Sequence, residues 1–131
     1  MKQKLEESGT KVYVLSMPVK SMSEHLDFDE GIPYQDYSSV ADGYIYWCQA
    51  FNLDVIDFRK MLKKQDMSYD EMFFRTDHHW TPLAAFYGYT YLLEELKADG
   101  YDLDKEGKFS DIENYTMETY EECWLGTYGI N

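Results

Sequence analysis

Apolar and polar residues alternate in blocks that predict helices and short strands in the first half of the chain. Residues 2–8 are typical of the end of a helix, because Gly9 is the residue type that commonly follows a helix C-terminus. Residues 11–17 are rich in β-branched and apolar side chains and predict a strand. Residues 53–58 predict a second short strand. A helix end followed directly by a buried type of strand indicates an α/β fold.

Two further helices are predicted on either side of the second strand. Ser38 or Ser39 is a suitable N-cap for a helix that ends near Phe51, and residues 59–64 predict a short basic helix. Cys48 in the first of these helices is predicted to be a buried thiol. Three aromatic residues of the same helix have helical spacing and are predicted to lie in the core: Tyr44, Tyr46 and Trp47.

The clearest helical pattern follows Thr81. Thr81 is an N-cap residue type, Pro82 fits the first helical position, and Gly100 marks the end. The apolar face of this helix is predicted to contain Ala85, Phe86, Tyr89, Leu92, Leu93 and Leu96. The remaining segments are residues 21–37 and 102–113, predicted as irregular polar connections, and residues 115–125, which have mixed strand character.

Composition indicates a folded chain of one domain. Its 131 residues are enough for one hydrophobic core, and with 44% hydrophobic and 18% aromatic residues it is not a disordered chain. The formal net charge of −13 argues against nucleic acid and anionic membrane surfaces as partners, because binding to both depends on Lys and Arg. No apolar run reaches the length of a membrane span, and no signal peptide is recognisable. We therefore predict an α/β domain of three layers, with a mostly parallel sheet flanked by helices.

An acid, a base and an aromatic residue lie within four consecutive positions, with a predicted strand before them and a capped helix after. Side chains two residues apart, such as those of Asp77 and His79, point the same way in an extended segment. A carboxylate that holds the Nδ1–H of an imidazole leaves Nε2 able to take a proton from a hydroxyl group, as the base of acyl transfer does. His78 is expected to point elsewhere. Taken alone, the residues also fit a loop pair that only completes hydrogen bonds before the helix.

Three neighbours of this pair are candidate substrate-binding residues: Arg75, His78 and Trp80. Arg75 is expected either to pair with an acid of the sheet or to orient a substrate oxygen. Trp80 is expected either to fill the core or to wall the site and exclude water.

Residues 74–82, Phe-Arg-Thr-Asp-His-His-Trp-Thr-Pro, resemble the signature of the bacterial DHHW proteins. These are related to the alginate O-acetyltransferases, a branch of the SGNH hydrolase-like superfamily. The resemblance extends to the strand at residues 11–18 and to the glycine-containing residues 125–129. It implies that Asp77 and His79 are two members of a Ser-His-Asp triad acting on acetyl esters of exopolysaccharides. It also implies an extracytoplasmic location, at the cell surface or envelope.

The nucleophile of this triad has no counterpart in the chain. In the family the serine follows later, in a Gly-Asp-Ser context, and neither that tripeptide nor a Gly-x-Ser-x-Gly elbow occurs here. We therefore expect residues 1–131 to form a single partial SGNH-like domain, truncated at both ends, whose partner is the missing C-terminal part of the same domain. Alone, the chain is expected to be inactive, because loss of a triad nucleophile removes most of the rate.

The predicted function is that of part of a bacterial acyl esterase or O-acetyltransferase. Its predicted substrate is an acetylated sugar or polysaccharide, and no cofactor or metal is predicted. One alternative is a non-catalytic carbohydrate-binding or assembly module that retains the motif as structure. A second is a metal-binding protein in which Asp77, His78 and His79 act with a distant acid such as Glu71.

Overall fold

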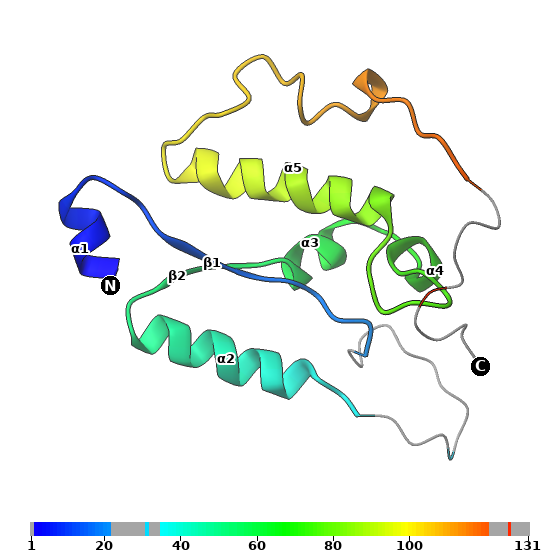
Figure 1. The fold of residues 1–131 in the computed structure, drawn as a ribbon, viewed down its shortest axis with the longest axis horizontal. Coiled ribbons are helices and arrows are strands. Elements are labelled where there is room, and N and C mark those ends of the chain that lie inside the picture. The colour runs from blue at the N-terminus through cyan, green and yellow to red at the C-terminus, as the bar shows by residue number, and fades with distance from the viewer. Residues whose placement is uncertain (1, 22–30, 32–34, 121–125, 127–131) are drawn as a thin grey trace. The chain divides into compact units, whose positions relative to one another are not determined.

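The computed structural model describes residues 2–21, 31, 35–120 and 126 (Figure 1). The chain divides into two compact units, Met1–Lys60 and Met61–Asn131. None of the described helices is both long enough and apolar enough to cross a lipid bilayer. The elements in chain order are α1 (Lys2–Glu7), β1 (Tyr13–Ser16), α2 (Ser38–Ala50), β2 (Asp54–Asp57), α3 (Arg59–Lys64), α4 (Tyr69–Met72), α5 (Pro82–Ala98) and a 3-10 turn at Ile112–Asn114.

The first unit contains a parallel sheet made of β1 and β2. Leu15 lies opposite Ile56 in the register of the two strands, and α2 contacts both of them. Parallel strands need a crossover connection, and α2 lies in the chain that connects them. Ile56 and Phe58 are buried, as expected for a strand covered by a helix. The predicted α/β class is confirmed as a parallel sheet flanked by helices, and α3 has the predicted bounds.

Arg59 joins the carboxyl end of β2 to α2. Its Nη2 atom lies 2.8 Å from Asp57 Oδ2, and its Nη1 atom lies 2.8 Å from Asp42 Oδ1. Burial raises the pKa of Asp57, but the hydrogen bonds from Arg59 outweigh this effect and hold the pKa below its usual value. The planar guanidinium group therefore ties the end of the sheet to the start of α2.

The predicted N-cap of α2 is wrong. Tyr37 occupies the cap position, and no side chain accepts a hydrogen bond there. Ser38 is already helical, and its backbone N–H donates a 2.8 Å hydrogen bond to Asp36 Oδ1. The carboxylate two residues earlier therefore takes the acceptor role that the sequence assigned to a serine hydroxyl group.

The prediction that the aromatic residues of α2 lie in the core is also wrong. Tyr44, Tyr46 and Trp47 are each more than half exposed. Cys48 is the buried residue of this helix, as predicted. A sheet of two strands covers too narrow a stripe of the helix to bury its aromatic positions as well.

The second unit contains α5, whose end matches the sequence signal at Gly100, with a φ of +94°. Its buried face differs from the predicted one. Ala84, Gly88 and Tyr91 are buried, whereas Tyr89, which was assigned to the apolar face, is exposed. Residues with little or no side chain allow a neighbouring segment to approach a helix closely, and α4 contacts α5 in this unit. The buried face therefore contains two small residues and one tyrosine.

Residues 99–120 are irregular apart from the 3-10 turn, which begins where the Asp111 side chain accepts a hydrogen bond from Glu113 N. The strand predicted for residues 115–125 is absent over residues 115–120. Residues 121–125, and most of the predicted irregular segment 21–37, lie outside the described residues.

Candidate active site

The backbone of residues 74–79 forms a loop that is closed at its neck. Phe73 and Trp80 form an antiparallel bridge, and Phe74 N donates a hydrogen bond to His79 O at 3.1 Å. The prediction of a strand before this segment is wrong, because α4 and a single bridge residue precede it. The loop itself consists of turns and bends and is not extended.

Thr81 secures the exit of the loop through three hydrogen bonds. Its backbone N–H donates to Met72 O at 2.8 Å, and its Oγ1 atom donates to Glu71 O at 2.5 Å. The same Oγ1 accepts from Ala84 N at 3.2 Å, which is the predicted N-cap of α5. Thr81 therefore connects the loop, α4 and α5.

Replacing Thr81 by alanine is expected to lower the free energy of unfolding by about 1–2 kcal/mol, because the cap of α5 is lost. Urea unfolding monitored by circular dichroism measures the change. Thr81→Ser is the matched control: it keeps the hydroxyl group and is expected to change stability by less than about 0.5 kcal/mol. An equal loss in both variants would show that the methyl group, and not the cap, carries the effect.

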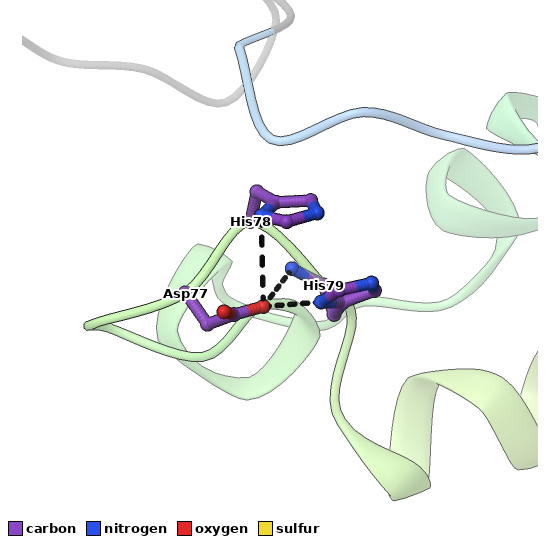
Figure 2. A group of neighbouring side chains, drawn as sticks. All are labelled: Asp77, His78 and His79. Carbon is purple, nitrogen blue, oxygen red and sulfur yellow. Dashed lines mark hydrogen bonds and ion pairs between the residues drawn. The ribbon is translucent and has the colours of Figure 1, made fainter. Parts of the chain in front are cut away.

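Asp77 is 1% exposed, although Thr76 and His78 on either side of it are exposed. Its Oδ1 atom accepts a 2.8 Å hydrogen bond from His79 N and also makes a hydrogen bond with His79 Nδ1. Figure 2 shows both contacts converging on this one oxygen. Because the backbone N–H of His79 and its ring are held by the same atom, the loop orients the imidazole relative to its own main chain.

The contact with Asp77 determines which nitrogen of His79 carries the proton. A carboxylate without a proton only accepts hydrogen bonds, so a hydrogen bond to it requires a proton on the imidazole nitrogen that makes the contact. Nδ1 is therefore assigned as the donor, and Nε2 of the neutral ring is left as a proton acceptor. The His79 side chain is 63% exposed, so a reactant can approach this ring.

The sequence predicted that His78 points away from Asp77 and His79, but in the structure it lies beside them. Its Nδ1 atom lies 3.8 Å from Asp77 Oδ1, and its ring stacks on that of His79, with centroids 4.0 Å apart and planes inclined by 36° (Figure 2). The expectation assumed extended backbone, whereas a bend brings consecutive side chains to the same side. His78 is therefore a direct neighbour of the His79 ring.

The other two candidate substrate-binding residues occupy different parts of the loop. Arg75 is exposed in the turn that follows the neck. Trp80 is half-buried at the neck, opposite Phe73. The tryptophan is therefore neither fully buried in the core nor fully exposed.

Asp77, His78 and His79 offer metal-ligand atoms that lie within 4.8 Å of one another. Zinc requires ligands at about 2.0–2.2 Å in a tetrahedral arrangement. Both Nδ1 atoms approach the same carboxylate oxygen, so an ion bound through these three atoms would replace the contacts that they make with one another. Glu71, the predicted additional ligand, accepts hydrogen bonds from the hydroxyl group and the backbone N–H of Ser68, which lower its pKa.

A cavity of about 450 Å³ lies along the first turns of α5, in the same unit as the loop. Leu83, Phe86 and Met117 contribute apolar surface to it, and Glu113 and Thr116 contribute polar groups. Phe86 meets Tyr115 edge to face, with centroids 5.2 Å apart. Sequence reasoning assigned Phe86 to a core face and missed this cavity, because no local signal links residues separated by so much of the chain.

Comparison with known families defines the class as an SGNH hydrolase-like domain. The family model described as ALGX, SGNH hydrolase-like domain, acetyltransferase AlgX, matches residues 1–121. The chain belongs to this family. Its membership supports an acyl- or acetyltransferase kind of function.

The solved structure of Bacillus cereus PatB1 is similar to this chain, with a TM-score of 0.58 and 24% sequence identity. The match covers 75% of this chain and 32% of the PatB1 chain, so this chain spans about a third of that protein. At this identity the similarity shows the fold alone. No curated protein gives a significant match.

Proposed function

We propose that this chain supplies the Asp–His part of a Ser-His-Asp centre in a larger SGNH-type domain that cleaves or transfers acetyl esters. The observation that carries the proposal is the hydrogen bond between His79 Nδ1 and the buried Asp77 carboxylate, which leaves Nε2 as a proton acceptor. Membership of a family described as acetyltransferases supports the same chemistry. The remaining part of the domain supplies the serine.

The proposed reaction proceeds in two acyl transfers. The serine oxygen attacks the acetyl carbonyl carbon while His79 Nε2 takes the hydroxyl proton, and Asp77 stabilises the resulting imidazolium. The ester C–O bond then breaks, and His79 returns the proton to the departing alkoxide. Water or a sugar hydroxyl group next attacks the carbonyl carbon of the acetyl-serine and gives its proton to His79. The bond between that carbon and the serine oxygen then breaks, and His79 returns the proton to the serine, so that acetic acid or the acetylated sugar leaves and the free serine is restored. Hydrolysis and transfer differ only in this second acceptor.

The finer assignment follows from the loop sequence. We propose that the chain belongs to the DHHW branch of the family and acts on acetylated exopolysaccharide or another cell-surface glycan outside the cytoplasm. Arg75, His78 and Trp80 are proposed to contact the substrate, because they flank His79 on the loop. The exposed face of the His78 ring, which is 51% exposed at its side chain, offers a surface on which a sugar can pack.

The test compares the 131-residue chain with the polypeptide that carries the complete domain. With an aryl acetate, the longer protein is expected to release a burst of phenol and to accumulate an acetyl-serine detectable by mass spectrometry. The short chain is expected to show no turnover that depends on His79. Esterase activity of the short chain that disappears in His79→Ala would contradict the proposed location of the nucleophile. Stoichiometric zinc in the purified protein would favour the metal-binding alternative.

A further inference from the structure

Gly126 lies against the loop that carries the Asp–His pair. Gly126 is buried, and its φ is +72°, a backbone conformation that favours glycine. A Cβ atom added at this position would lie 2.9 Å from Asp77 Cβ and closer still to Thr76 O. These separations are shorter than van der Waals contact, so the backbone of residue 126 can occupy this place only without a side chain.

This contact helps to explain the burial of Asp77. A carboxylate in a surface loop is normally solvated, and the residues on both sides of Asp77 are exposed. Asp77 itself is 1% exposed, and Gly126, some 50 residues further along the chain, touches both its Cβ region and the preceding carbonyl group. The main chain at Gly126 therefore covers the peptide from which the carboxylate projects.

We propose that Gly126 is a positioning residue for the Asp77–His79 pair. By packing its backbone directly on the Thr76–Asp77 peptide, it excludes water from the carboxylate and holds Oδ1 where it receives His79 Nδ1. A hydrogen bond shielded from water is stronger and exchanges its proton more slowly. Gly126 touches no reacting atom and acts only through Asp77. Any effect of Gly126 on catalysis rests on the proposed function. Its effect on the hydrogen bond between Asp77 and His79 does not.

The experiment uses the full 131-residue chain with ¹⁵N-labelled histidine and NMR. The wild-type chain is expected to show a low-field Nδ1 proton on His79 that exchanges slowly with solvent, and an unprotonated Nε2. In Gly126→Ala, the added methyl group displaces Asp77. The exchange rate of this proton is expected to rise by at least about tenfold, and the single tautomer to become a mixture.

Gly107→Ala is the matched control. Gly107 also has a positive φ, +69°, but nothing lies within 4 Å of an added Cβ. The Gly107→Ala substitution therefore introduces the same kind of backbone strain in the same unit without touching the loop. The NMR signals of His79 are expected to stay unchanged. Equal changes in both variants, or none in Gly126→Ala, would overturn the proposal.

A measurement on the unmodified chain covers the case in which Gly126→Ala does not fold. A nuclear Overhauser effect is expected between the Hα protons of Gly126 and the Hβ protons of Asp77, and its absence overturns the proposal. The two proposals also fail separately. If the NMR effects appear but the complete domain has no His79-dependent activity, positioning stands and the proposed function fails. If that activity exists but Gly126→Ala leaves it and the NMR signals unchanged, only the positioning role fails.

Discussion

Replacing His79 by alanine is expected to lower kcat for acetyl-ester cleavage by about five orders of magnitude in the polypeptide that carries the complete domain. No other group then takes the serine proton or returns it to the leaving alkoxide, so both acyl transfers lose their base. KM is expected to change by less than about threefold, because an alanine removes little of the surface that binds the ground state. Steady-state kinetics on an aryl acetate and on an acetylated glycan measure both constants.

His78→Ala is the matched control for this prediction, since it removes a neighbouring imidazole of similar exposure from the same loop. Its Nδ1 atom lies 3.8 Å from Asp77 Oδ1, which is longer than a hydrogen bond between these two atoms. We expect His78→Ala to lower kcat by less than about tenfold and to act mainly on KM for the glycan. A loss of kcat as large as that of His79→Ala would contradict the assignment of His79, and not His78, as the base.

The elements that the sequence predicts correctly depend on short-range chemistry. The N-cap at Thr81, the proline that follows it, and the glycine that ends α5 act within one helical turn, and all three appear as expected. The contact between Asp77 and His79 also follows from residues close in sequence. The spacing predicted the correct pair of residues but assumed an extended strand, whereas residues 77–79 form a bend.

The features that the sequence does not predict depend on which distant segment of the chain packs against a helix or loop. Tyr46 and Trp47 have the spacing of core residues, but the two-stranded sheet is too narrow to cover them. The buried face of α5 contains Ala84, Gly88 and Tyr91, whereas a search for large apolar residues at helical spacing selects a different face. The burial of Asp77 depends partly on Gly126, a contact across the chain that no local pattern contains.

Asp77→Asn is expected to lower kcat by about four orders of magnitude in the complete domain while leaving its fold intact. The amide is nearly isosteric with the carboxylate but carries no charge, so it cannot stabilise the imidazolium that forms in each step. If its NH₂ group faces His79, Nδ1 must accept a hydrogen bond and the proton moves to Nε2, which then cannot act as a base. The His79 tautomer, read by ¹⁵N NMR on the 131-residue chain, reports this change without any substrate.

Asp70→Asn provides the control for charge, because it removes an exposed carboxylate from α4 in the same unit and is expected to leave kcat unchanged.

Asp77→Ala shows whether Asp77 contributes to the stability of the loop as well as to kcat. It leaves His79 N without its side-chain acceptor, and the free energy of unfolding is expected to fall by about 1–3 kcal/mol. If the Asp77→Asn side chain places its oxygen at the Oδ1 position, it still accepts from His79 N and loses much less stability, while its activity falls because the amide has no charge to stabilise the imidazolium. If both variants lost stability in proportion to activity, Asp77 would serve the fold of the loop and not the proton transfer.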